Sequence, residues 1–298
     1  MAKSSVAFIG TGAIGSPMAF RLLQAAFPLV VNNRRRQGAE TLIDAGAAWA
    51  ETAAAAAEHA ELIFTCLPSI EAMDDVCFGP SGIMSGGKPR CVVDLSTTGP
   101  DDAFRIGARL NAGGIAFIDA PVTGGVPRAR EGKLTVIASG DPDEIEFARP
   151  AFETIGSTIV VVGSKCGQAQ TVKLINNMLN YTAMAATCEA MVLGVKAGID
   201  PNTILQVVNT GSGRNSATEV KFPLAILPRT FDFGATNRVA AKDLSLFLGV
   251  AENLSIPTPV ASFISQLWRT WLPTHGDEDM TTLVKMFEQW AGVEVSGK

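Results

Sequence analysis

Short apolar runs recur through the first half of the chain, separated by more polar stretches. The runs are rich in Val, Ile and Phe, as strands are, and occupy residues 5–9, 28–32, 62–66, 91–95, 115–119, 134–138 and 158–162. Between the earlier runs, stretches such as 39–45 and 52–60 favour helices. This alternation predicts an α/β fold, in which a doubly wound and mainly parallel sheet carries helices on both faces.

The pattern changes after Gly163. Residues 167–197 contain no proline and one interior glycine, Gly194, so they predict a single helix of about 30 residues that ends near Gly198 and Pro201. The rest of the chain is helical in pattern and is interrupted by Gly and Pro. The second half therefore predicts an all-helical structure.

Three glycines directly follow the first apolar run, in the segment Gly10-Thr11-Gly12-Ala13-Ile14-Gly15. In a strand–turn–helix of this kind the first glycine permits a tight turn, the second lets the backbone approach a pyrophosphate, and the third packs the helix closely on the strand. The phosphates would meet free N–H groups at the start of a helix. We predict a Rossmann-type dinucleotide-binding domain; a glycine-rich turn without a ligand is the alternative.

The length of 298 residues leaves room for a second domain. We predict an NAD(P)-binding Rossmann domain over residues 1–164. Residues 165–298 would form an all-α domain for substrate binding and dimerisation, joined to the first by the long interdomain helix.

The residues after the second apolar run indicate which dinucleotide binds. An NAD site usually places Asp or Glu there to hold the adenosine ribose, whereas this chain has Asn33, Arg34 and Arg35 and no acidic residue between Arg21 and Glu40. A guanidinium holds a 2′-phosphate through charge-assisted hydrogen bonds. We therefore predict NADP as cofactor, with NAD possible; a solvated basic turn that binds nothing is the alternative.

Composition narrows the other functions. The formal net charge of −5 argues against a nucleic-acid surface, which requires a basic face. Five cysteines show no metal-ligand spacing, so we expect free thiols in a reducing compartment and no metal site. Neither a signal peptide nor a membrane-spanning segment is evident, so we expect a cytoplasmic protein that does not bind membranes.

Hydride transfer needs a proton donor, and the chain offers few. We expect His59 and His275 to be surface or packing residues. Tyr181 is followed four positions later by Ala185, whereas short-chain dehydrogenases carry a lysine there. Lys173 and Asn177 remain; at i and i+4 of the long helix they share one face and can both point into an interdomain cleft. Two solvent-facing polar residues are the alternative.

Four separated segments resemble the β-hydroxyacid dehydrogenase family, which includes 3-hydroxyisobutyrate dehydrogenase, tartronate semialdehyde reductase and the glyoxylate/succinic semialdehyde reductases. They cover nearly the whole chain, at residues 10–18, 119–134, 167–177 and 242–244. Residues 94–98 and Cys66-Leu67-Pro68 also resemble family loops that line the cofactor.

The resemblance implies an NADP(H)-dependent oxidoreductase that interconverts a β-hydroxy acid and its semialdehyde or keto acid. Lys173 would be the general acid/base, with its pKa lowered by burial and by nearby positive charge. Asn177 would hold the substrate hydroxyl or orient the lysine. The substrate carboxylate would bind at Thr123 and the N–H groups of Gly124 and Gly125, with Ser96 and Lys242 beside the nicotinamide and substrate.

The chain departs from the family at three positions. Thr123 replaces a usual Ser and narrows the carboxylate site, Ala169 replaces a helical glycine without harm, and Ala235 replaces an aromatic residue and would widen the pocket. An imine reductase is a second possibility, which Lys173 argues against because those enzymes usually carry Asp or Tyr there. A catalytically silent NADP-binding protein is a third possibility, against which Lys173 and Asn177 also argue.

Relatives assemble through the helical half, so we expect a homodimer or homotetramer. The apolar side chains of that half exceed what a small domain easily buries; we expect these to be exposed: Trp268, Trp271, Leu272, Phe287 and Trp290.

Overall fold

The structure is a computed structural model that describes residues 3–87 and 89–297. The chain forms two compact units, residues 1–173 and 174–298, and each is described here by itself. The division falls inside one helix, α8 (Gln168–Lys196), whose first six residues belong to unit 1. The domain limit at 164/165 remains a prediction.

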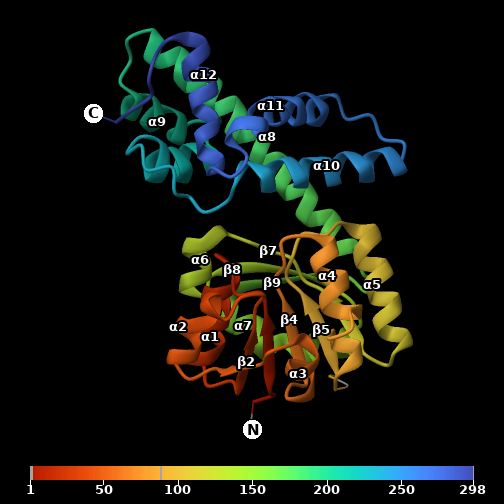
Figure 1. Ribbon diagram of the computed structural model, residues 1–298. Helices are drawn as coiled ribbons and strands as arrows, with labels where there is room; N and C mark the ends of the chain where they lie inside the picture. The colour runs from red at the N-terminus through yellow and green to blue at the C-terminus, as the bar shows by residue number, and fades with distance from the viewer. Residues whose placement is uncertain (1–2, 88, 298) are drawn as a thin grey trace. The chain divides into compact units, whose positions relative to one another are not determined.

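Unit 1 is built on one sheet, in which the strands lie in the order β3-β2-β1-β4-β5-β6-β8-β7 and β9 pairs with β8 (Figure 1). Within the run from β3 to β6, each pair of adjacent strands is parallel. Their bounds are β1 Val6–Ile9, β2 Leu29–Asn32, β3 Ala48–Trp49, β4 Leu62–Thr65, β5 Cys91–Asp94 and β6 Ala116–Asp119. The order reverses around β1, which is the arrangement of a doubly wound nucleotide-binding fold.

Alternate residues of each central strand face opposite sides of the sheet and enter two separate cores. Val6 and Phe8 of β1 lie in one core with helices α1 (Gly15–Gln24), α2 (Glu40–Asp44), α6 (Gly125–Glu131) and α7 (Pro142–Ile155). Ala7 and Ile9 lie in the other, with α3 (Ala53–Glu58), α4 (Ile70–Phe78) and α5 (Pro100–Ala112). Burial on both faces explains why these strands read as nearly continuous apolar runs.

The sheet ends in a mixed region. Strand β8 (Leu134–Ser139) runs antiparallel to β6 and to β7 (Val122–Thr123), and parallel to β9 (Gly156–Gly163). Because Asp119 pairs with Ser139 in this region, the end of β6 lies beside the segment that leads into α8.

Unit 2 is helical. The body of α8 packs with α9 (Pro201–Thr210), a π-helical segment η3 (Ala217–Ile226), α10 (Asn237–Asn253), α11 (Pro259–His275) and α12 (Leu283–Ala291). Short 3₁₀ segments complete the fold: η1 (Arg36–Ala39) and η2 (Ile83–Ser85) in unit 1 and η4 (Met280–Thr282) here.

The apolar side chains of unit 2 correct one expectation. Trp268, Trp271 and Phe287 are buried in its core, and Leu272 is half-buried, so only Trp290 is largely exposed. The rings of Tyr181 in α8 and Trp268 in α11 meet edge to face, and the rings of Phe287 and Trp290 do so within α12. The sequence pattern underestimated how much apolar surface these helices bury against one another.

Candidate functional site

The glycine turn after β1 has the geometry that a pyrophosphate requires. Gly10 has a φ of +97°, and a Cβ there would lie 2.3 Å from the Cys66 carbonyl oxygen. A Cβ at Gly15 would lie 2.1 Å from the Gly10 oxygen, whereas one at Gly12 would meet nothing within 4 Å. The start of α1 has no side-chain cap, so its N–H groups suit an anion. The turn therefore fits a dinucleotide.

The loop after β2 is tied to the glycine turn, since the Thr11 hydroxyl donates to the Gly38 carbonyl at 2.9 Å. The Asn33 amide donates to the Arg35 carbonyl at 3.2 Å, in an exposed hydrogen bond. The side chains of Arg34 and Arg35 are exposed. This arrangement leaves two guanidinium groups beside the strand end where an adenosine ribose would lie.

The loops after β4 and β5 hold each other. The backbone N–H of Leu67 donates to the Ser96 hydroxyl at 2.8 Å, and the Ser96 N–H donates to the buried Asp94 carboxylate at 3.0 Å. Burial raises the pKa of Asp94 and raises that of the Cys66 thiol to about 12, so the thiol is protonated at neutral pH. Pro68 is exposed. The predicted cofactor residues of unit 1 thus follow four adjacent parallel strands at one edge of the sheet.

The predicted carboxylate loop follows β6 after a short connection. Thr123 ends β7, and Gly124 and Gly125 both have positive φ, at 133° and 74°. Successive residues in such conformations turn their N–H groups toward a common point, as an anion nest requires. A Cβ at Gly124 would also lie 2.9 Å from Cδ of Arg128, so both the positive φ and the close side chain favour glycine at this position.

The first turn of α8 is fastened to these loops by two buried residues that sequence reasoning missed. Asp119 accepts from the N–H groups of Gly167 (3.0 Å) and Gln170 (3.1 Å). The fully buried Gln170 amide donates to Asp119 (2.7 Å) and to the Ser96 carbonyl (3.1 Å), while its oxygen accepts from the N–H groups of Thr98 and Gly99. In the sequence, Asp119 opens the family-like segment 119–134 and Gln170 lies one turn before Lys173, but neither was assigned a role.

These contacts define a clasp, formed by Asp119, Gln170 and the 96–99 loop. Burial raises the pKa of Asp119 to about 6, although its hydrogen bonds oppose that rise. Lys173 follows Gln170 by three residues on α8 and is half-buried. The clasp therefore sets the helix that carries Lys173 against the loops that carry Ser96 and Asp119.

In unit 2, Asn177 belongs to a second buried polar group. The Asp243 carboxylate accepts from the Asn177 amide at 2.7 Å and from the Tyr181 hydroxyl at 2.9 Å through the same oxygen. The Lys242 ammonium lies 3.2 Å from its other oxygen, as an ion pair outside hydrogen-bond geometry. Burial and Asp243 raise the pKa of Tyr181 well above its usual range, so this phenol is a neutral donor. Asn177 is thereby held in one orientation.

The position of Ala235 is partly buried against the core of unit 2, and Phe231 packs there as well. Phe233 instead lies over the Lys221 ammonium, 5.2 Å from nitrogen to ring centroid. The wider pocket expected at Ala235 remains a prediction.

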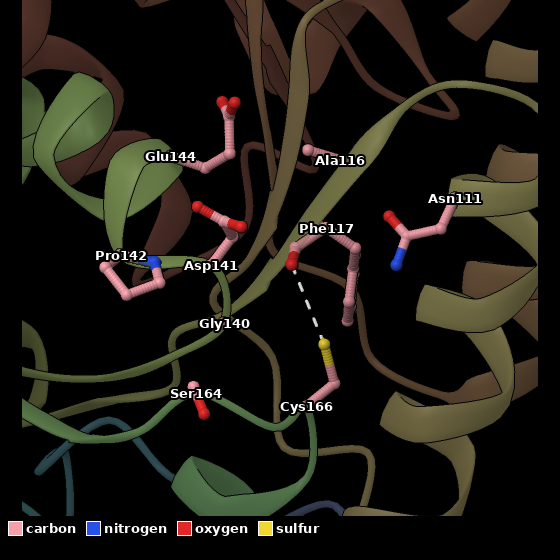
Figure 2. Close-up of a pocket in the computed structure, with 9 residues that line it drawn as sticks. All are labelled: Asn111, Ala116, Phe117, Gly140, Asp141, Pro142, Glu144, Ser164 and Cys166. Atoms are coloured by element: carbon pink, nitrogen blue, oxygen red, sulfur yellow. Dashed lines mark hydrogen bonds between the residues drawn. The ribbon is translucent and has the colours of Figure 1, made fainter.

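A concave region of about 450 Å³ lies elsewhere in unit 1, near the start of β6 (Figure 2). Figure 2 shows the Cys166 thiol donating to the Phe117 carbonyl at 3.6 Å, with Asp141 and Glu144 at the start of α7 on one side and Asn111 of α5 on the other. None of the predicted site residues lines it.

Among the residues that the structure describes, no group of three His, Cys, Asp or Glu side chains is placed to hold a metal. Over the same residues, no helix has the length and apolar character needed to span a membrane.

The sheet and its glycine turn define a dinucleotide-binding protein. Residues 5–163 match the family model for the NAD-binding domain of 6-phosphogluconate dehydrogenase. Residues 167–287 match that for the NAD-binding region of NADP-dependent 3-hydroxyisobutyrate dehydrogenase.

Curated relatives align over nearly the full length. 2-(Hydroxymethyl)glutarate dehydrogenase of Eubacterium barkeri is 33% identical over 300 residues, covering 100% of this chain and 99% of the relative. 3-Hydroxyisobutyrate dehydrogenase of Pseudomonas aeruginosa is 33% identical, covering 89% and 91%. The solved structure of Psf3 in complex with NADP+ and 2-OPP has a TM-score of 0.86 and 29% identity, covering 94% and 99%.

The chain belongs to the β-hydroxyacid dehydrogenase family, and these relatives make it an NAD(P)-dependent enzyme of that kind. The expected two-part fold, a Rossmann-like sheet and a helical C-terminal region, is confirmed. An imine reductase from Myxococcus stipitatus, at 18% identity and a TM-score of 0.64, shares the fold alone.

Proposed function

We propose that the chain is an NADP(H)-dependent oxidoreductase that interconverts a small β-hydroxy acid and its semialdehyde or keto acid. The observation that carries the proposal is the clasp. Gln170 and Asp119 fasten the first turn of α8, one turn before Lys173, to the loop that carries Ser96 at the dinucleotide edge. Such positioning is what a proton donor in hydride transfer requires.

In this proposal Lys173 is the general acid/base. The nicotinamide supplies or accepts the hydride when bound. In reduction, Lys173 gives its proton to the carbonyl oxygen as the alkoxide develops, and in oxidation it removes the hydroxyl proton. The Thr123 hydroxyl and the N–H groups of Gly124 and Gly125 hold the substrate carboxylate.

Asn177 holds the substrate hydroxyl. Asp243 takes one of its two amide N–H groups, which leaves the second to donate to the substrate oxygen. Lys242, in contact with Asp243, supplies positive charge beside the nicotinamide, and Ser96 borders the nicotinamide ribose. Because Asp243 is 2% exposed, Asn177 and Tyr181 act as its obligatory donors and the group is rigid.

The preference for NADP rests on Arg34 and Arg35. Both guanidinium groups are exposed after β2, where a 2′-phosphate would accept charge-assisted hydrogen bonds from them. The Asn33 amide donates to the Arg35 carbonyl and so fixes the backbone of this turn. The complex of Psf3 with NADP+ supports the same cofactor. The remaining contacts come from the glycine turn and from Cys66, Leu67 and Pro68.

Substitution of the proposed acid/base tests the function. We expect Lys173→Ala to remove more than nine-tenths of the turnover while NADPH binding, measured by fluorescence titration, is nearly unchanged. The matched control is Lys165→Ala, an exposed lysine just before the same helix, which should keep wild-type activity. Retention of more than a tenth of the activity in Lys173→Ala contradicts the assigned role.

One assay separates the proposed activity from two alternative functions, an imine reductase and a silent nucleotide-binding protein. A panel of aldehydes and imines with NADPH would show aldehyde turnover if the proposal holds and imine turnover for an imine reductase. A silent nucleotide-binding protein would bind NADPH and turn over neither. Lys173 favours the first of the three.

We also propose a homodimer or homotetramer. Large apolar side chains of unit 2 are exposed, among them Leu193 (72%), Phe263 (64%) and Trp290 (63%). A second copy of the chain would cover such side chains. A monomeric mass by light scattering would refute this assembly.

A further inference from the structure

One exposed cation of unit 1 lies directly on the loop to which the substrate carboxylate was assigned. The side chain of Arg128, in α6, packs over Gly124: a Cβ built on that glycine would lie 2.9 Å from Cδ and 3.1 Å from Cβ of the arginine. Because Nε is bonded to Cδ, the guanidinium begins one bond beyond this contact. Arg128 and Gly124 are both exposed, so a solute can reach both of them.

The Arg128 guanidinium has no counter-ion of its own. Over residues 3–87 and 89–297, it forms neither an ion pair nor a side-chain hydrogen bond. Glu131, which follows Arg128 by three residues, pairs instead with Lys133 at 2.9 Å. The charge of Arg128 is therefore available to an anion that binds at this loop.

The loop beside Arg128 presents backbone donors that the chain does not use. Gly124 and Gly125 have φ angles of 133° and 74°, and among the described residues their N–H groups donate to no other backbone group. Such N–H groups attract an anion, but they carry only partial charges. A carboxylate held by them would gain a full counter-charge from a guanidinium beside the loop, through a charge-assisted hydrogen bond.

We propose that Arg128 is a further substrate-binding residue, which makes the enzyme select free carboxylates over uncharged esters of the same acids. This inference rests on the proposed function, which places the substrate carboxylate at Thr123, Gly124 and Gly125. These residues, Arg128 and Lys173 all belong to unit 1. Arg128 binds the substrate and takes no part in proton transfer.

A neighbouring arginine provides the matched control. Arg130 lies on the same short helix and is also exposed. The atoms closest to a Cβ on Gly124, however, belong to Arg128 and Leu134. Because residues two apart on a helix do not face the same way, removal of Arg130 changes the net charge equally and leaves the contact with the loop intact.

The test compares 3-hydroxypropanoate with its methyl ester, using NADP+ as oxidant. The acid carries only the hydroxyl and carboxylate that every β-hydroxy acid has, and the ester lacks its charge. The wild-type enzyme should favour the acid. Arg128→Gln should raise the KM for the acid about tenfold with kcat within about twofold, since one exposed charge-assisted hydrogen bond is lost. Arg128→Lys should retain part of the preference.

The other measurements separate this role from a general effect. In Arg128→Gln the kcat/KM for the ester should change by less than about twofold, and Arg130→Gln should leave both substrates unchanged to the same degree. An equal loss for both compounds in Arg128→Gln, or no loss for the acid, overturns the proposal. A rise in the KM for NADP+ in place of that for the acid also overturns it, because Arg128 would then bind a cofactor phosphate.

Binding provides a readout that does not require turnover. With NADP+ present, 3-hydroxypropanoate should raise the Tm of the wild-type protein more than the ester does. This difference should be lost in Arg128→Gln and kept in Arg130→Gln. If that pattern appears and neither compound is oxidised, Arg128 binds the carboxylate and the proposed function is wrong.

The reverse result is equally decisive. Oxidation of the acid with no dependence on Arg128, in either KM or Tm, would leave the proposed function standing and overturn this inference. If the acid neither raises the Tm nor is oxidised, both are wrong.

Discussion

Removal of the Gln170 amide is the sharpest test of the clasp. Gln170→Leu keeps nearly the same volume but loses all four hydrogen bonds, to the Ser96 carbonyl, the Asp119 carboxylate, and the N–H groups of Thr98 and Gly99. All four partners are buried, so each is left without its partner in a region that water does not reach.

The cost follows from the chemistry of the four partners. At about 1 kcal/mol for each of the three neutral groups and about 2 kcal/mol for the carboxylate, the loss in free energy of unfolding is about 5 kcal/mol. For a unit of this size that corresponds to a fall in Tm of about 10–20 °C. Since α8 would no longer be held against the 96–99 loop, kcat should fall as well.

Thermal unfolding and steady-state kinetics measure both effects. Gln168→Leu is the matched control because it lies on the same turn of α8, is exposed, and accepts one hydrogen bond, from the Lys165 N–H. It should change the stability by less than about 1 kcal/mol. If the two variants have equal stability, the clasp does not hold the helix and the reasoning above is wrong.

Further variants test the cofactor edge and the Asp119 carboxyl of the clasp. Replacing Arg34 and Arg35 by Ser should raise the KM for NADPH about 10- to 100-fold, since exposed guanidinium–phosphate bonds are partly screened by salt. The KM for NADH should stay nearly unchanged, because NADH has no 2′-phosphate. Gly12→Ala should fold normally and lose NADPH affinity, whereas Gly15→Ala should lower the Tm, since only the latter Cβ meets backbone at 2.1 Å. Burial raises the pKa of Asp119 to about 6, above its value in the unfolded chain, so the folded state holds this proton more tightly. The free energy of unfolding should therefore fall by up to about 3 kcal/mol as the pH rises from 4 to 6. Unfolding of wild type and Asp119→Asn across that range gives the difference, and a flat difference contradicts the raised pKa.

Local patterns made much of the fold predictable. The strands around residues 6–9, 62–65 and 91–94 are apolar on both faces and bounded by turn residues. The glycine spacing after the first strand indicates a tight turn, in which Gly10 has a positive φ. The long helix at 168–196 was also predictable, because it contains no proline and is followed by Gly198 and Pro201, which end helices. Neighbouring residues decide each of these features.

The candidate site was only partly predictable. The motifs indicated Lys173, Asn177 and the residues of the cofactor edge, whose roles remain proposals. They gave no indication that Gln170 joins two loops, because its partners are 51 to 74 residues away in the sequence. The burial of Lys221 in unit 2 was equally hidden, since a lysine in an amphipathic segment normally faces solvent.

The sequence by itself determined the order of strands and helices, the dinucleotide turn and the basic residues beside it. These depend on backbone preferences and on polarity, which are properties of short segments. Tertiary packing alone decided that Trp268 and Phe287 are buried, that Asp119 and Gln170 fasten α8, and that the Lys221 ammonium donates to Asn180. Burial and pairing depend on which distant segments cover a side chain, and only the folded chain sets that.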